Sequence, residues 1–356
     1  MEKFNFKILP IAREARGLTQ AELTKLIPNL SQGNYSRMEK GLLAVPEDTW
    51  HEIAKKLNFL PSFFTHEKPI RDQAEYYYRK RASMPRKLQI KLEATFDILR
   101  VWIEGLLQDV DVPEFKLPPI EVKGNNSPEE IARKVRALMG LQRGPIDNLV
   151  RAIERHGIMV YFLKNAPEKF DGTTIVTQSG QRIIVINDSL SNDRKRYTIA
   201  HEFGHNVMHL PFSPILDPDR DVEREADSFA SEFLMPELDI RRDLINFRFS
   251  KLGDLKAFWK VSKASLIRRA YDLKHVDKTK YTNMMIELSR AGERKVERND
   301  VNLDSPALLQ LITATYINEL GYTREELSNI ISISSEDFDF FLLGKEPNRA
   351  KFKIVI

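Results

Sequence analysis

The chain has 356 residues, of which 42% are apolar and 30% are charged, and its formal net charge is +4. This length and composition are typical of a globular protein with two or three domains, and the small net charge indicates no particular class of partner. The chain contains no cysteine. Disulfide bonds and thiolate metal ligands are therefore excluded, and any metal must be held by His, Asp or Glu.

The N-terminal stretch MEKFNFKILPIAR lacks the apolar core of a signal peptide. No apolar run in the sequence approaches the roughly 18 residues that a membrane-spanning helix needs. We therefore expect a cytoplasmic protein that does not insert into a membrane.

Residues 9–58 predict four or five short helices, two of which are joined by a tight turn. Thr19 and Glu22 have the spacing of a capping box at the start of the first helix of this pair. Ser31 is the expected N-cap of the second helix, and Gly41 is expected to end it. Two helices joined in this way, the second polar at its start, form the helix-turn-helix pattern.

This region, which includes GLTQAELTKLIPNLSQGNYSRMEKG, closely resembles the XRE/Cro-type repressor domains. In that family the second helix of the pair enters the major groove of double-stranded DNA. The resemblance implies that residues 1–66 are a DNA-binding domain that recognises an operator. The side chains implied to contact base edges are Gln32, Asn34 and Tyr35. The side chains implied to contact phosphates are Gln20, Ser36 and Arg37.

A helical module that keeps this fold without binding DNA is the alternative. The net charge over residues 1–66 is only +2, with nine Lys and Arg against seven Asp and Glu, which suits that alternative. XRE domains often pair, so a homodimer is one option for the assembly.

A basic stretch follows, because residues 71–91 carry seven Lys and Arg against two acidic residues. Three tyrosines at 76–78 adjoin its most basic part, and interleaved basic and aromatic side chains suit nucleic-acid backbone and bases. A solvated linker helix whose tyrosines pack on a neighbouring domain is an equally good interpretation. We assign residues 67–125 to a basic helical linker.

Strand signals appear at residues 158–163, 173–178 and 181–188, after further helical segments. We predict a small antiparallel sheet directly before a helix that begins near residue 191. The expected fold class is α+β and mostly helical, with residues 126–295 as the second domain.

The segment RYTIAHEFGHNVMHL, residues 196–210, places His201 and His205 one helical turn apart with Glu202 between them. Two imidazoles at this spacing can converge on one tetrahedral metal ion, and the carboxylate beside them can deprotonate a water molecule. We predict Glu202 as the general base of a peptide-bond hydrolase. His209 lies about 6 Å further along the helix, so we expect it beside the ligands or in the core rather than on the metal.

The third ligand is expected on a helix predicted for residues 221–234, where Glu223 and Asp227 lie one turn apart. In a His-His-Glu site, Glu223 would bind the metal and Asp227 would orient a ligand histidine through its other ring nitrogen. Glu225 lies on the opposite side of this helix and is a poorer candidate. The spelling E-x-x-A-D also matches the third-ligand motif of gluzincins such as thermolysin-like and neprilysin-like peptidases.

Together, RYTIAHEFGHNVMH and the later E-x-E-A-D-x-F-A-x-E-F-L-M-P resemble the ImmA/IrrE-type metallopeptidases of bacteria and phages. The resemblance implies a zincin-like domain with a small sheet and an active-site helix, and zinc, or manganese in its place, as cofactor. It also implies a protein substrate, a repressor or the chain itself, cleaved in stress, prophage or mobile-element control. As in zinc peptidases generally, the strand at residues 181–188 would be the sheet edge that receives an extended substrate.

An XRE domain fused ahead of the peptidase is a common arrangement in that group. The alternative is a transcriptional regulator that cleaves nothing and whose metal domain senses a signal or binds a partner.

Residues 296–356 are expected to form a further helical region. Within it, GYTREELSNIISISSEDFDFFLLG aligns with the N-terminal helix pair, with Gly321 opposite Gly17 and Thr323 opposite Thr19. This alignment indicates a degenerate helix-turn-helix. Its second helix is acidic and aromatic and would repel phosphate, so we expect it to contact protein rather than DNA.

Overall fold

The computed structural model describes residues 4–66, 84–215, 219–294, 296–298, 300–302 and 304–342. They fall into two compact units. The first combines the described parts of Met1–Val112, Ile175–Gly180 and Leu308–Ile356, and the second combines those of Pro113–Thr174 and Gln181–Ala307. The first unit thus includes both the N-terminal and the C-terminal regions. Most of the predicted basic stretch, up to residue 83, lies outside the described residues.

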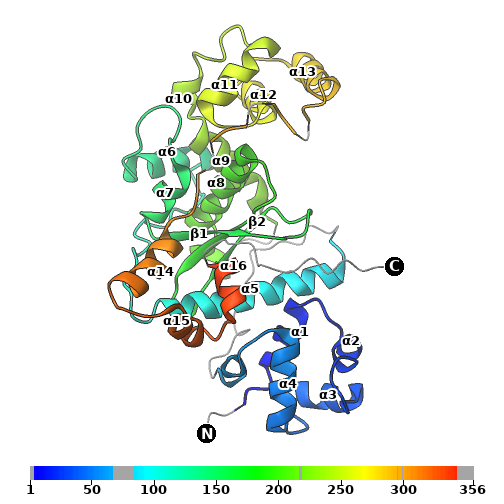
Figure 1. Ribbon diagram of the computed structural model, residues 1–356. Helices are drawn as coiled ribbons and strands as arrows, with labels where there is room; N and C mark the ends of the chain where they lie inside the picture. Colours follow the sequence, from blue (N-terminus) through cyan, green and yellow to red (C-terminus); the bar gives the residue numbers. More distant parts are fainter. Residues whose placement is uncertain are drawn as a thin grey trace. The chain divides into compact units, whose positions relative to one another are not determined.

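The first unit is built almost entirely of helices (Figure 1). Its helical elements are α1 (Ile8–Ala15), α2 (Gln20–Thr24), α3 (Gln32–Glu39), α4 (Glu47–Leu57), the 3-10 turn η1 (Pro61–Thr65), α5 (Arg86–Leu106), α14 (Leu308–Asn318), α15 (Arg324–Ile330) and α16 (Ser335–Phe341).

The helix pair α2–α3 begins and turns as its capping residues predict. The Thr19 backbone N–H donates to Glu22 Oε2 at 2.7 Å, and the Glu22 N–H donates to Thr19 Oγ1 at 3.1 Å, which completes a capping box. Ser31 caps α3 by accepting from the N–H of Asn34 at 3.2 Å.

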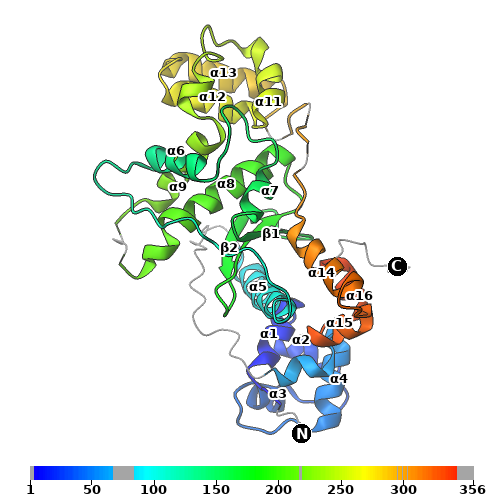
Figure 2. The ribbon, with the colours of Figure 1, turned by 90° about the vertical axis from the view of Figure 1, so that its left-hand side faces the viewer.

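The same local geometry recurs in α15–α16. Thr323 and Glu326 form a second capping box, with backbone-to-side-chain bonds of 2.8 and 3.2 Å. Ser334 caps α16 by accepting from the N–H of Asp337 at 3.2 Å. α15 and α16 lie beside α5, where Phe341 contacts the ring of Trp102 at a centroid distance of 5.0 Å (Figure 2).

The second unit contains the sheet and the helices around it. Its elements are α6 (Pro128–Leu138), α7 (Leu149–Glu154), β1 (Ile158–Leu163), β2 (Gly172–Val176), β3 (Arg182–Asn187), α8 (Asn192–Met208), η2 (Leu210–Ile215), α9 (Val222–Leu234), α10 (Glu237–Ile240), η3 (Phe249–Lys251), α11 (Leu252–Trp259), α12 (Lys263–Asp272) and α13 (Lys278–Arg290). The last residues of β2 and the turn after it group with the first unit.

The sheet differs from the prediction in two respects. Its strand order is β1-β3-β2, and β1 pairs with β3 in parallel, with Ile158 opposite Arg182 and Leu163 opposite Asn187. The sheet is therefore not the antiparallel one predicted. β3 lies in its centre, so residues 181–188 cannot form the edge that we expected to receive a substrate. Strand order depends on contacts between segments, which the residue pattern of a single strand does not encode.

Helices α8 and α9 pack against each other through aromatic side chains. Phe203 of α8 contacts Phe229 and Phe233 of α9 at centroid distances of 5.9 and 5.3 Å, and all three rings are buried. Gly204 lies at this contact, where an added Cβ would be 2.9 Å from the Phe229 ring. Gly204 therefore gives room to a side chain of α9.

None of the helices in the described part of the chain combines the length and the apolar composition that crossing a bilayer requires.

Gly204→Ala is expected to destabilise the protein. In a helix interior, alanine is more stable than glycine by about 1 kcal/mol. Here, however, the Cβ of alanine would overlap the Phe229 ring, and overpacking of a core costs about 1–3 kcal/mol of stability. Thermal unfolding should show a lower Tm. The matched control is Gly253→Ala in α11, where an added Cβ meets nothing within 4 Å. A Tm that rises for Gly204→Ala as for the control would contradict this account of the helix contact.

Candidate metal centre

Helix α8 supplies two of the three side chains that could hold a metal ion. The helix starts after its N-cap Ser191 and runs to Met208, and its buried face holds it in the core of the second unit. His201 and His205, one turn apart on it, project together toward α9. The predicted α8 and α9 thus form with the expected bounds to within a few residues.

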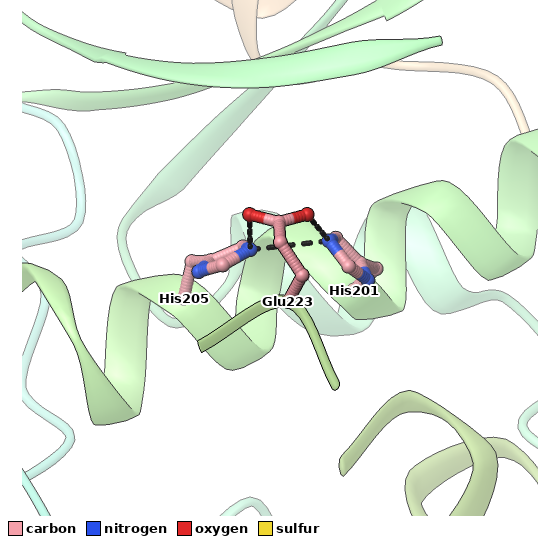
Figure 3. A group of neighbouring side chains, drawn as sticks. All are labelled: His201, His205 and Glu223. Carbon is pink, nitrogen blue, oxygen red and sulfur yellow. Dashed lines mark hydrogen bonds and ion pairs between the residues drawn. The ribbon is translucent and has the colours of Figure 1, made fainter. Parts of the chain in front are cut away.

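The side chains of His201, His205 and Glu223 converge on one point (Figure 3). The two Nε2 atoms are 3.1 Å apart. Glu223, in the first turn of α9, places one carboxylate oxygen 3.5 Å from His201 Nε2 and the other 3.6 Å from His205 Nε2. The structure therefore brings together the three residues that the sequence assigned to the metal.

Asp227 lies beside this group, one turn after Glu223. Its Oδ1 is 2.9 Å from His201 Nδ1. Because a carboxylate only accepts hydrogen bonds, Nδ1 carries the proton and donates it, which leaves Nε2 of a neutral ring as a lone pair that faces the site. Asp227 thus has the contact expected of a residue that orients a ligand histidine.

These donors suit a divalent metal ion. Two imidazole nitrogens and a carboxylate oxygen are a common ligand set for catalytic zinc, which keeps a fourth position open. Nitrogen lone pairs that face each other at 3.1 Å beside a carboxylate repel unless a proton or a metal ion lies among them. The donor set of His201, His205 and Glu223 is therefore compatible with a metal cofactor.

The two histidines differ in their pKa. Burial lowers the pKa of His201, but hydrogen bonds to Asp227 and Glu223 outweigh it and raise the pKa to about 10. Burial lowers the pKa of His205 well below its usual value, and the neighbouring imidazoles of His201 and His209 lower it further. Without a metal, a proton on His201 takes the place of the ion, whereas His205 is neutral and ready to bind.

Glu202 is buried next to this group, and its carboxylate is held by Thr174, which Asn206 holds in turn. Thr174 Oγ1, on β2, donates to Glu202 Oε2 at 3.1 Å, and Asn206 Nδ2 donates to Thr174 Oγ1 at 2.8 Å. Burial raises the pKa of Glu202 to about 7, against the opposing effects of His201 and the Thr174 hydrogen bond. A carboxyl group with this pKa exchanges protons near neutral pH, as a general acid-base requires.

Thr174 and Asn206 were not predicted from the sequence. Asn206 stands four residues after Glu202, and this helical spacing was the available signal. Thr174 reaches Glu202 only because of how the strands order in the sheet.

His209 is not one of the three converging side chains, but it contacts one of them, His205. Its Nδ1 is 2.9 Å from Nδ1 of His205, and its Nε2 is 2.9 Å from Glu225 Oε2. Glu225 also accepts from Arg220 Nε at 2.8 Å and Nη2 at 2.9 Å. From the sequence, Glu225 was predicted to be a poorer candidate for the metal ligand because it lies on the opposite side of α9 from Glu223. That side of α9 faces His209, which ends α8 as its C-cap residue.

The side chains implied to contact DNA are spread over α2 and α3. Gln32, Asn34 and Arg37 are exposed and Ser36 is half-buried. Gln20 is half-buried and donates through Nε2 to Glu39 at 2.6 Å.

Tyr35 does not fit the role of a base-contacting residue. Its side chain is fully buried. The alternation of faces along a helix explains the difference, because Tyr35 follows Asn34 by one residue and so points about 100° away from it. Tyr35 is a core residue of the helix pair.

Metal binding at this centre is expected to strengthen as pH rises. Because the pKa of His201 in the metal-free protein is raised to about 10, a metal ion must displace a proton from this ring at any pH from 6 to 8. The apparent zinc association constant should therefore rise by about tenfold per pH unit over this range. Chelator competition at pH 6, 7 and 8 measures it, and an affinity independent of pH would contradict the protonated His201.

Comparison with known protein families gives one match. Residues 153–271 match the family model Peptidase_M78, described as an IrrE N-terminal-like domain. A search of curated proteins gave no match. The matched range includes β1 to β3, α8 and α9, and with them the His-His-Glu group and Glu202. The match supports the metallopeptidase part of the resemblance seen in the sequence.

Proposed function

We propose that the second unit is a zinc-dependent endopeptidase, with manganese as the other metal that its ligands would accept. The observation that carries this proposal is the buried Glu202 beside His201, His205 and Glu223. A structural metal site has no use for a further carboxylate held next to its ligands. A peptidase needs one to move protons.

The proposed chemistry assigns one role to each group. Zinc, when bound by His201, His205 and Glu223, supplies a Lewis acid that polarises the peptide carbonyl and acidifies water. Glu202 takes a proton from the attacking water and passes it to the amine that leaves. Thr174 and Asn206 hold Glu202 so that its carboxylate keeps one orientation through both transfers.

We also propose that the first unit binds an operator in double-stranded DNA and that the protein is a transcriptional regulator. Its peptidase would cleave a repressor, or the chain itself, in stress, prophage or mobile-element control. The capped α2–α3 pair supports this proposal, since it leaves Gln32 and Asn34 exposed at the start of α3.

The α15–α16 pair would be a second, altered copy of the same module. Its support is the repeated capping box and N-cap. Asp337, which corresponds to Asn34 in these caps, is buried and accepts from Arg16 Nη2 at 2.7 Å and from Asn58 Nδ2 at 3.2 Å. In this copy the start of the second helix contacts the N-terminal helices, so it would serve protein packing and not DNA binding.

A regulator that cleaves nothing remains the second candidate, with the metal domain as a sensor or a docking site. Both candidates bind metal and DNA, so only proteolysis separates them.

Glu202→Gln should abolish proteolysis while it preserves metal binding. Loss of a general acid-base costs about 10²–10⁴-fold in rate, whereas Gln keeps the size of the side chain. The experiment incubates the zinc-loaded protein, with and without DNA, with the repressors encoded near its gene and follows fragments by mass spectrometry.

A matched control variant completes this experiment. Glu287→Gln, an exposed carboxylate on α13, is the matched control and should cleave normally. Cleavage by Glu202→Gln at the wild-type rate would refute the assigned base. A wild-type protein that binds zinc and its operator but cleaves neither a repressor nor itself would favour the non-proteolytic regulator.

Gln32→Ala and Asn34→Ala should each weaken operator binding. A lost side-chain contact to a base edge costs about 1–3 kcal/mol, or about 5- to 150-fold in affinity, and relaxes sequence preference at that position. The operator is first selected from random duplexes, and gel shifts at fixed salt then compare specific with nonspecific DNA. Gln108→Ala, also exposed in the first unit, is the control. Unchanged discrimination in both α3 variants would remove these residues from base contact.

A further inference from the structure

A continuous line of hydrogen bonds runs from a metal ligand into the protein. It links His205 Nδ1 to His209 Nδ1 at 2.9 Å and His209 Nε2 to Glu225 Oε2 at 2.9 Å. It ends in a two-point contact of Arg220 with the Glu225 carboxylate, at 2.8 and 2.9 Å. His209 is fully buried, and the side chains of Glu225 and Arg220 are 18% and 19% exposed.

The chemistry of the groups fixes the direction of these hydrogen bonds. Arg220 can only donate, and its paired N–H groups hold Glu225 as a carboxylate, which can only accept. His209 must therefore donate from Nε2. A neutral imidazole has one donor nitrogen and one acceptor nitrogen, so Nδ1 of His209 accepts.

The proton between the two histidines then belongs to His205. With Nδ1 of His209 as acceptor, Nδ1 of His205 carries the hydrogen, and Nε2 of His205 is a lone pair directed at Glu223 and His201. This is the tautomer that a metal ligand needs. The two ligand histidines adopt this tautomer through different partners. His201 donates directly to Asp227, whereas His205 donates to the ring of His209, which in turn donates to Glu225.

We propose that His209, Glu225 and Arg220 are positioning residues that fix the tautomer and ring orientation of His205 and so raise its affinity for the metal. The proposal rests on the metal-dependent function proposed above. It gives a role to each of the three acidic residues in the first two turns of α9. Glu223 binds the metal, Glu225 orients His205 through His209, and Asp227 orients His201.

Packing alone does not explain this arrangement. An apolar side chain at position 209 would fill the same buried space without a polar ring that needs two partners. Glu225 accepts from that ring and is itself held by Arg220, and the other ring nitrogen of His209 contacts a metal ligand, His205. A purely structural role predicts that stability changes on mutation and metal affinity does not.

The test measures zinc dissociation constants by chelator competition at one pH on the full chain, for variants that circular dichroism shows to be folded. His209→Phe keeps a ring but has no nitrogen, and Glu225→Gln keeps the shape but not the charge. Loss of such a partner of a ligand histidine typically weakens metal binding by about 10–100-fold. We expect this range for His209→Phe and its lower end for Glu225→Gln. The double variant should lose no more than His209→Phe, because both act through the same ring.

Val207→Ala is the packing control, since Val207 is equally buried on α8 and takes no part in the hydrogen bonds. It should lower the Tm and leave the zinc affinity unchanged. A second readout is the visible spectrum of the cobalt-loaded protein, which should change in His209→Phe and not in Val207→Ala.

Zinc binding as tight as wild type in folded His209→Phe or folded Glu225→Gln would overturn the proposal. An equal loss of affinity in Val207→Ala would also overturn it. These outcomes are independent of proteolysis. A wild-type chain that binds zinc without cleaving any protein would refute the peptidase and leave the positioning role intact.

Discussion

The second unit depends on one electrostatic constraint, which is that two imidazole lone pairs and a carboxylate face one another within 3.1–3.6 Å. Such a group is stable only around a positive charge. The surrounding structure serves to hold it. The buried aromatic contact between Phe203 and Phe229 fixes α8 against α9, and this contact determines where Glu223 stands relative to the two histidines. The acid-base group Glu202 is tied to the sheet by Thr174. In this unit, the packing of the core therefore positions the side chains of the site.

The first unit combines the N-terminal helices α1–α4 with α5 and with α14–α16 from later in the sequence. Arg16 and Asn58, at the ends of α1 and α4, both bind Asp337 of α16. A buried carboxylate that lost these partners would be left with an uncompensated charge, which is costly. This contact holds α16 against the ends of α1 and α4. It does not involve the exposed residues of α3. The two proposed activities, DNA binding and proteolysis, are assigned to different compact units of one chain.

The sequence predicted the features that depend on local pattern. Helix periodicity and capping residues such as Thr19 and Ser31 predicted the helices, and the spacing of His201, Glu202 and His205 predicted the metal group. Apart from the placement of Glu223 and Asp227 beside the α8 histidines, the contacts between elements were not predicted. The central position of β3 follows from pairing with β1 and β2, and the contact of Glu225 with His209 follows from how α8 ends against α9. A helical projection shows which side of a helix a residue takes, but not what lies opposite that side.

X-ray absorption at the zinc edge of the metal-loaded protein tests the central claim most directly. The account predicts one zinc per chain, with two imidazole ligands and further oxygen ligands, at about 2.0–2.2 Å. His209→Phe should keep two imidazoles, because His209 acts through His205 and not on the metal. Three imidazoles in the wild type that fall to two in His209→Phe would contradict the ligand assignment. A protein that takes up no metal would contradict the metal centre itself.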